Sequence, residues 1–301
     1  MRASDEASRH RAGYVAIVGR PNVGKSTLLN RMVGQKVSIV SRKPQTTRLN
    51  ITGIVTREDA QIVFVDTPGY QTEHRSTLNR LMNRAVAAAV DGVDAALWVV
   101  EALHFGERDE AIGRLLAPTL PVVLAINQID RVSDRKLLLP FIAQLAKFRD
   151  LAAFVPVSAT GGTNVEALLR AVAALMPEGP ALFGADEITT VNERVLAAEI
   201  LREKLFRQLG EEVPYGTAVE IEKFEMEGAL RRIHAVVLVG KQSQKGMVIG
   251  KGGEKLKAIA TPARQDMERL FGGKVFLELW VKVRKGWAED ETILKRLGYT
   301  E

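Results

Sequence analysis

Residues 19–26, GRPNVGKS, fit the pattern G-x-x-x-x-G-K-[ST] and follow a short apolar run. Glycines in such a turn let backbone N–H groups point at phosphate oxygens, and a helix that begins there adds the positive end of its dipole. Lys25 is expected to place its charge between the β- and γ-phosphates, and Ser26 to offer its hydroxyl to Mg²⁺. The motif therefore predicts a nucleoside triphosphate site. Its expected cofactor-binding residues are Gly19, Asn22, Val23, Gly24, Lys25, Ser26 and Thr27.

A second group of polar residues indicates which base is bound. Asp130 closes the sequence NQID directly after the apolar run 122–126. Its carboxylate can accept hydrogen bonds from N1–H and the exocyclic amine of guanine, whereas adenine offers neither donor. A Ser-Ala-Thr sequence ends the next apolar run, where its backbone N–H groups are expected to face guanine O6. The expected base-site residues are Asn127, Gln128, Asp130, Ser158, Ala159 and Thr160.

Two further segments are suited to sensing the γ-phosphate. Asp66 and Gly69 belong to a DTPG sequence, in which Asp66 is expected to reach Mg²⁺ through water and the Gly69 N–H to contact the γ-phosphate. The KPQTTR sequence, residues 43–48, offers a threonine that closes on Mg²⁺ and the γ-phosphate as a first switch. We favour Thr47 over Thr46. The expected metal-site residues are Ser26, Thr47 and Asp66, and the expected catalytic residues are Lys25, Thr47, Gly69 and Asn22.

These motifs need a scaffold that places the ends of several strands together. Over residues 13–176, apolar runs suited to buried parallel strands alternate with helical stretches, which predicts an α/β fold with a mostly parallel sheet. An additional hairpin-like pair is expected. Strands are expected at Tyr14–Val18, Ile62–Val65, Ala95–Val100, Val122–Ile126 and Phe154–Val157, helices at Thr27–Val33, Leu78–Ala89, Asp109–Leu116, Arg135–Phe148 and Val165–Leu175, and the hairpin at Lys36–Val40 and Asn50–Thr56.

The remaining sequence predicts a second, smaller domain. Residues 177–190 carry two prolines and two glycines in their first eight positions, which is typical of a linker. The order of elements then changes to α-β-β-α-α-β, which describes an α+β domain. We expect a flexible N-terminus (1–12), a nucleotide-binding domain (13–176), the linker, the second domain (191–285) and a polar tail with one helical turn (286–301). Trp280 is expected in the core of the second domain.

Composition excludes several classes of protein. The chain of 301 residues is 46% hydrophobic and 26% charged and has no cysteine, so it is neither disordered nor disulfide-stapled. It has no apolar run of about 18 residues and no signal peptide, so the cytoplasm is the expected location. Charge is uneven: residues 186–230 hold 5 Lys/Arg against 11 Asp/Glu, and residues 231–285 hold 13 against 4. This basic block predicts a polyanionic partner.

A glycine-rich loop lies inside the basic block. Residues 248–253, VIGKGG, contain a G-x-x-G sequence between two expected helices. Together with the α-β-β-α-α-β order, the loop resembles that of a type II KH domain, which clamps about four nucleotides of single-stranded RNA. A glycine break between helices with no ligand is the alternative. The expected RNA contacts are Gly250, Lys251, Gly252, Gly253, Lys245 and Lys255, flanked by Lys241 and Lys257.

The sequences GRPNVGKST, KPQTTR and DTPG, followed by this loop, resemble the Era family of GTPases over residues 12–286. The resemblance implies a P-loop GTPase domain joined to a type II KH domain, with GTP or GDP and Mg²⁺ as cofactors. It also implies binding of the 3′ end of 16S ribosomal RNA in the GTP state, and a role in 30S subunit assembly. One residue departs from the family: Gln128 replaces a lysine whose stem covers the base.

Catalysis is expected to be slow, because Tyr70 and not a water-orienting glutamine follows Gly69. Gln71 lies one position further on. Asn22 resembles an asparagine that, in related GTPases, holds a potassium ion in place of an arginine finger. The alternative is that Asn22 only braces the loop.

Three functions compete at this point. The chain is a GTP-dependent assembly switch on ribosomal RNA, a GTP-timed binder of some other RNA, or a regulator held at the cytoplasmic face of the inner membrane by its basic block. We expect a monomer in each case.

Overall fold

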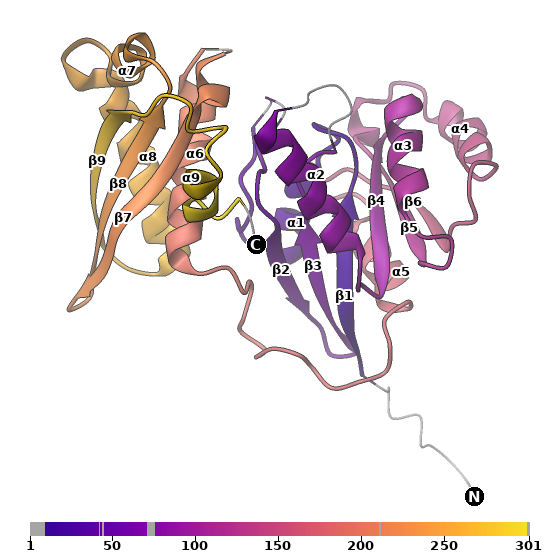
Figure 1. The fold of residues 1–301 in the computed structure, drawn as a ribbon. Coiled ribbons are helices and arrows are strands. Elements are labelled where there is room, and N and C mark those ends of the chain that lie inside the picture. Colours follow the sequence, from indigo (N-terminus) through magenta and orange to yellow (C-terminus); the bar gives the residue numbers. More distant parts are fainter. Residues whose placement is uncertain (1–9, 42, 44, 71–75, 211, 300–301) are drawn as a thin grey trace, which may run out of the picture. The chain divides into compact units, whose positions relative to one another are not determined.

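The computed structural model describes residues 10–41, 43, 45–70, 76–210 and 212–299. Of the residues discussed above, most of the expected N-terminal segment, Pro44, Gln71 and the last two residues lie outside the described part. The described residues form two compact units (Figure 1). The first consists of those in Met1–Ser38, Asn50–Glu73 and Asn83–Thr190, and the second of those in Ile39–Leu49, His74–Met82 and Val191–Glu301.

The first unit is built on a six-stranded sheet of order β2-β3-β1-β4-β5-β6. All neighbours are parallel except β2 and β3, which form an antiparallel pair. The central strands are buried on both faces, as their continuous apolar runs predict. The strands are β1 (Arg11–Val18), β2 (Ile51–Thr56), β3 (Ala60–Asp66), β4 (Ala95–Glu101), β5 (Val122–Asn127) and β6 (Ala153–Pro156).

Helices cover both faces of this sheet. Apolar residues of α2, α3 and α4 pack in one core cluster with β1, β4 and β5, while α1 and α5 contact each other and the opposite face. The helices are α1 (Lys25–Val33), α2 (Thr77–Val90), α3 (Glu107–Leu115), α4 (Leu138–Leu145) and α5 (Val165–Ala173), with short 3₁₀ turns η1 (Ile129–Arg131) and η2 (Arg135–Leu137). The expected α/β architecture is therefore confirmed, and the loops after β1, β3, β5 and β6 lie at one edge of the sheet.

The expected hairpin between Lys36–Val40 and Asn50–Thr56 is wrong. Strand β2 pairs with β3, and residues 36–40 form no strand. The reason lies in the Asn30 side chain, whose Oδ1 accepts the N–H groups of Val37 (2.9 Å) and Ser38 (2.8 Å). Its Nδ2 donates to Ser38 O (2.7 Å). These bonds take up backbone groups that a strand ladder would need.

Residues 177–190, which we expect to form a linker, are hydrogen-bonded to strands of the first unit. Gln61 of β3 accepts the N–H groups of Leu182 (2.7 Å) and Phe183 (2.8 Å), and its amide donates to Phe183 O (2.9 Å). The N–H of Ile54 in β2 donates to Ile188 O (2.9 Å). The segment therefore covers the exposed edge of the sheet, which would otherwise offer unpaired backbone groups.

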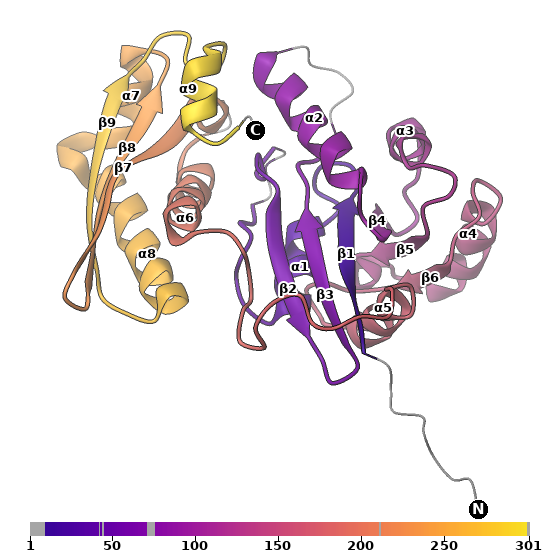
Figure 2. The ribbon, with the colours of Figure 1, turned by 60° about the horizontal axis from the view of Figure 1, so that its bottom comes forward.

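The second unit has the α-β-β-α-α-β order expected of it. Its three-stranded sheet has the order β7-β8-β9, with β7 antiparallel and β9 parallel to β8. Helices α6 and α8 pack on one face of this sheet over a buried apolar cluster (Figure 2). The elements are α6 (Glu193–Gln208), η3 (Val213–Gly216), β7 (Thr217–Glu227), β8 (Leu230–Val239), α7 (Gln242–Ile249), η4 (Lys251–Gly253), α8 (Glu254–Phe271), β9 (Val275–Val283) and α9 (Glu291–Arg296).

The opposite face of this sheet departs from the sequence-based expectation at two places. The expected polar tail does contain a short helix, α9, but its apolar residues are buried against Ala218, Val236 and Leu238 of the sheet. Trp280, expected in the core, points to the same outer face and is 44% exposed, because α6 and α8 cover the other one. The buried tail residues are Trp287, Ile293, Leu294 and Tyr299.

Candidate nucleotide site and glycine-rich loop

The loop between β1 and α1 is held by close backbone packing. A Cβ atom at Gly19 would lie 2.4 Å from Val99 O, and one at Gly24 would lie 2.4 Å from Asn127 Nδ2. Gly24 also has φ +96°, and the non-glycine Asn22 sits in the left-handed region at φ +66°. Glycine is therefore required at both motif positions, and the turn delivers the chain into the first turn of α1, where Lys25, Ser26 and Thr27 lie.

Lys25 is a buried cation at the centre of this loop. Its ammonium group donates to Gly19 O (2.9 Å) and Arg20 O (3.1 Å), and the residue is 6% exposed. Burial lowers the pKa of Lys25 to about 8, although the nearby Asp66 carboxylate acts in the opposite direction. A polyphosphate bound in the loop would restore its charge.

Asp66 provides the oxygen atoms expected near a metal ion. Its Oδ2 accepts hydrogen bonds from Ser26 Oγ (2.6 Å) and Ser38 Oγ (2.8 Å). Its Oδ1 is buried and has no hydrogen-bond partner among the described residues. Burial raises the pKa of Asp66, with Lys25 and the two hydroxyls opposing the rise. A bound cation would supply the partner that Asp66 Oδ1 lacks among the described residues.

This donor set fits Mg²⁺. The ion prefers hard oxygen ligands, keeps several waters and relies on substrate phosphates, so one hydroxyl and one carboxylate suffice. Within the part of the chain that the structure describes, no group of three His, Cys, Asp or Glu side chains could hold a metal ion. Ser38 had no sequence signal, because its contact with Asp66 joins residues 28 positions apart.

Gly69 packs directly on the phosphate loop. A Cβ atom there would lie 2.7 Å from Pro21 Cγ and 2.9 Å from Pro21 Cα, so only glycine fits. The DTPG turn therefore lies directly against the phosphate loop. The next residue, Tyr70, is half-buried against the core cluster beside α2, α3 and α4.

Asn127 joins two loops of the base site. Its Nδ2 donates to Val23 O (2.8 Å), and its Oδ1 accepts the Ala159 N–H (3.0 Å). The side chain is 1% exposed, so both bonds are shielded from water. Asn127 therefore fixes the phosphate loop relative to the loop that is expected to face guanine O6.

Asp130 is exposed, and hydrogen bonds from its neighbours hold its carboxylate. Ser158 Oγ donates to Asp130 Oδ1 (2.6 Å), and Thr160 Oγ1 lies 3.4 Å from the other oxygen. The Ser158 hydrogen bond lowers the pKa of Asp130, so the group stays ionised. Arg31, which the sequence did not single out, donates to Ala159 O (3.0 Å) and Thr160 O and so anchors this loop to α1.

Gln128, the departure from the family pattern, is held by two neighbours. It has φ +67°, and its side-chain amide donates to Asn22 O (3.1 Å). Arg131 donates a hydrogen bond to the side-chain oxygen Oε1 of Gln128 (2.6 Å). Its amide plane is therefore fixed beside the phosphate loop.

The two switch threonines belong to the second unit. Thr46 and Thr47 are 8% and 7% exposed. The Thr46 hydroxyl donates to Lys43 O (2.7 Å) and lies 2.6 Å from Ser41 Oγ, so its partners are within the same segment.

The glycine-rich loop of the second unit has one side free of side chains. Gly250 ends α7 at φ +75° and ψ 177°, and a Cβ atom there would lie 2.7 Å from Lys255 Cβ. Gly252 and Gly253 also have positive φ, but a Cβ atom at either would meet open space. Gly250 is therefore required by the turn itself, whereas Gly252 and Gly253 leave room for another backbone to approach.

The lysines nearest this loop have no acidic partner among the described residues. Other cations of the basic block do have one: Arg231 pairs with Glu193 (2.8 Å), and Arg232 with Glu227 (2.6 Å). By contrast, five lysines around the loop form no ion pair with any residue that the structure describes, so the positive charge of the block is available there. They are Lys241, Lys251, Lys255 and Lys257, which are exposed, and the half-buried Lys245.

Comparison with known proteins adds to this geometry. A family model described as a 50S ribosome-binding GTPase matches residues 14–128, and a KH domain model matches residues 212–288. The GTPase Era of Nitrosomonas eutropha is 55% identical over 293 residues, which cover 97% of this chain and 99% of the relative. The GTPase Era of Xanthomonas oryzae is 54% identical over 294 residues, covering 97% and 98%.

Solved structures of relatives also match nearly the whole chain. A single-residue variant of Aquifex aeolicus Era bound to GDP·AlF₄⁻ is 39% identical with a TM-score of 0.93, covering 97% of this chain and 100% of that one. Era in complex with MgGDPNP and nucleotides 1506–1542 of 16S ribosomal RNA is 38% identical, with the same TM-score and coverage. With this identity over nearly its full length, and with both family models in place, the chain belongs to the GTPase Era family.

Proposed function

We propose that this chain is a GTP-hydrolysing switch that binds the single-stranded 3′ region of 16S ribosomal RNA and assists assembly of the 30S subunit. The family is one of GTPases, and one solved relative holds MgGDPNP together with nucleotides 1506–1542 of that RNA. One observation carries the RNA part of the proposal: the bare side of the loop at Gly252 and Gly253 lies among lysines without acidic partners among the described residues.

Each residue of the nucleotide site has a role in this proposal. Lys25 contacts the β- and γ-phosphates, while Ser26 and Asp66 hold Mg²⁺, directly and through water. Mg²⁺ supplies charge neutralisation of the phosphates when it is bound. Asp130 selects guanine, and Gly69 contacts the γ-phosphate through its N–H. Thr47, the threonine that we favour from the sequence, completes the metal site.

Turnover of the isolated protein should be slow, because no water-orienting glutamine directly follows Gly69. Asn22 would hold a potassium ion at the transferred phosphate. Its left-handed backbone and the bond between its carbonyl and Gln128 support the alternative, bracing role.

The RNA proposal is tested with a glycine variant and a matched control. Gly252→Asp adds a negative charge where an RNA backbone must approach, and should weaken binding of the 1506–1542 RNA by about 100-fold. Gly228→Asp makes the same change in the β7–β8 turn, at a closely similar φ (+61° against +59°) and also in open space. GTP affinity should be unchanged in both variants. Equal RNA affinity of the two variants, measured by filter binding, would refute the assignment of the loop.

For location, we propose a cytoplasmic monomer. None of the helices that the structure describes is long and apolar enough to cross a membrane. The lysines around the loop would also attract anionic lipid headgroups, which is the basis of the membrane alternative. Binding of the chain to phosphatidylglycerol vesicles, compared at equal salt with binding to the RNA, separates the two. Vesicle binding that survives competing RNA would favour the membrane function.

A further inference from the structure

Helix α6 contains four charged side chains that are buried, which is rare unless each has a defined partner. They are Glu199, Arg202, Glu203 and Lys204, and Glu203 is fully inaccessible. The nucleotide and RNA sites described above use none of them. Their partners show what they do, because several lie in the segment Ile39–Leu49, which carries the switch threonines and packs in the same unit.

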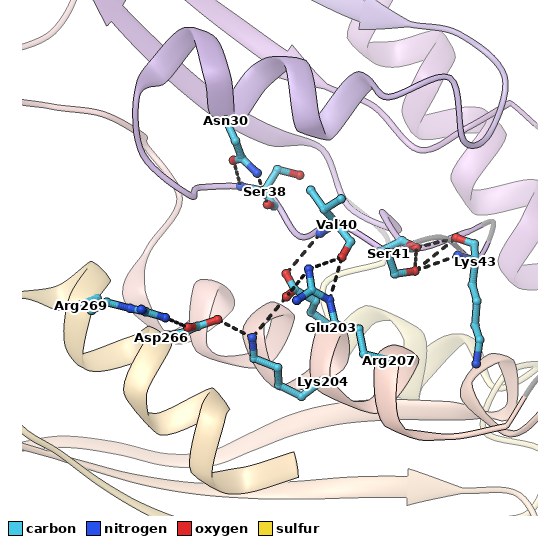
Figure 3. Close-up of polar contacts among 11 residues, drawn as sticks. Asn30, Ser38, Val40, Ser41, Lys43, Glu203, Lys204, Arg207, Asp266 and Arg269 are labelled. Carbon is cyan, nitrogen blue, oxygen red and sulfur yellow. Dashed lines mark hydrogen bonds and ion pairs between the residues drawn. The ribbon is translucent and has the colours of Figure 1, made fainter. Parts of the chain in front are cut away.

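Two side chains of α6 hold the backbone of one residue in that segment (Figure 3). The N–H of Val40 donates to Glu203 Oε2 (3.2 Å), and Val40 O accepts from Arg207 Nη2 (3.0 Å) and Nε (3.2 Å). Glu203 Oε1 lies 3.1 Å from Arg207 Nη2 and 3.3 Å from Lys204 Nζ. Both backbone groups of Val40 are thus fixed by side chains that are themselves paired.

A second contact holds the other end of the segment. Glu199 and Arg202 form a buried ion pair (2.6 Å), and Arg202 donates a further hydrogen bond to Thr46 O. Lys43 reaches the end of α6, where its ammonium donates to Leu209 O (2.6 Å). The carbonyls at this end of the helix carry the negative end of its dipole, which favours a cation there.

The same cluster joins α6 to the helix that follows the glycine-rich loop. Lys204 forms a buried ion pair with Asp266 of α8, whose other oxygen accepts from Arg269 (Figure 3). Helix α8 begins at Glu254, directly after Gly253 of the loop. A set of polar contacts therefore runs from Val40 through Glu203 and Lys204 to Asp266, in the C-terminal half of the helix that the loop precedes.

We propose that Glu203 is a positioning residue that docks the first switch segment on α6, and that the Lys204–Asp266 pair makes this docking sensitive to RNA at the loop. The inference rests on the proposed function, since it needs both ligands. In that function the nucleotide contacts the segment that contains Thr47, and RNA contacts the loop from which α8 starts. One ligand changes the affinity for the other only if it binds better when the switch segment is docked on α6, or better when it is undocked. The effect of RNA on nucleotide affinity then equals the effect of nucleotide on RNA affinity.

The test measures coupling in the full chain. The Kd of GDPNP is determined by calorimetry without and with saturating 1506–1542 RNA. The first Kd divided by the second is the coupling factor, called the ratio below. For the wild type we expect a ratio of about 5 to 150, the usual range for allosteric coupling. Glu203→Gln and Asp266→Asn should each bring the ratio to within about twofold of one. Glu203→Asp, which keeps the charge, should recover part of it.

Two further variants separate positioning from general damage to the fold. Arg207→Gln changes a half-exposed side chain and should lower the ratio even if Glu203→Gln fails to fold. Arg264→Gln breaks an ion pair with Glu268, which also lies on α8 (2.9 Å), and should keep the wild-type ratio. Thermal melting identifies variants that do not fold.

The outcomes distinguish this inference from the proposed function. If folded Glu203→Gln and Arg207→Gln keep the wild-type ratio, the docking role is refuted and the proposed function stands. If the wild type binds both ligands with a ratio of one, the docking role and the nucleotide control of RNA binding are both refuted, and RNA binding alone stands. If the wild type does not bind the RNA at all, the proposed function itself fails.

Discussion

Raising the pH from 7 to 9 should weaken GDP binding through one group of the protein, Lys25. Burial lowers the pKa of Lys25 to about 8 in the nucleotide-free protein. A bound diphosphate favours the charged ammonium and should return its pKa towards the ordinary 10.5. At a pH between these two pKa values, the GDP complex binds more protons than the free protein. The affinity for GDP is therefore highest below pH 8 and declines as the pH rises above 8.

The size of the effect follows from the two pKa values. At pH 9, Lys25 of the free protein is about 90% neutral, so binding takes up about 0.9 proton and the Kd of GDP is about tenfold higher than at pH 7.

Calorimetry in two buffers of different ionisation enthalpy measures the proton uptake directly. Lys25→Arg is the control, because arginine stays charged throughout this range. Guanine N1–H also titrates at alkaline pH, but that contribution is common to both proteins. Equal pH dependence of the two proteins, or no proton uptake by the wild type at pH 9, would refute the buried-cation account of Lys25.

Three other predictions concern the same site. Asp130→Asn should shift preference from GDP to the xanthosine diphosphate, because the donor and acceptor at position 2 are exchanged; competition binding with both nucleotides checks this, and retained GDP preference would contradict it. Asn127→Ala should lower the free energy of unfolding by about 2–6 kcal/mol, since Val23 O and Ala159 N–H each lose a buried partner worth about 1–3 kcal/mol; urea titration measures it, and a loss below about 1 kcal/mol would mean that water replaces the amide. Potassium should accelerate GTP hydrolysis over sodium, and Asn22→Ala should abolish the difference, whereas equal wild-type rates in both salts leave Asn22 only its bracing role.

Local patterns in the sequence predicted most of the elements and the nucleotide motifs. Strands such as β1 and β5 are short apolar runs with clear ends, and the motif spacing alone placed Lys25, Asp66 and Asp130 at one edge of the sheet. The KH-like order of the second unit could be predicted for the same reason, because each of its elements carries its own periodicity.

The features that the sequence did not predict depend on contacts between distant residues. The hairpin prediction failed because the Asn30 side chain occupies the backbone of residues 37 and 38. The tail looked polar because only a few of its residues are apolar, yet those few are buried. Arg31, Ser38 and Glu203 carry no motif, and their importance is visible only once their partners are in place.

The most direct test of the central claim compares RNA binding in the two nucleotide states. The affinity of the wild-type chain for the 1506–1542 RNA is measured at fixed salt with saturating GDPNP and Mg²⁺, and again with saturating GDP and Mg²⁺. We predict tighter binding with GDPNP, because the proposed switch makes the loop at Gly252 responsive to the γ-phosphate. Equal affinity in both states, or no affinity in either, would contradict the claim that this chain is a GTP-controlled RNA-binding switch.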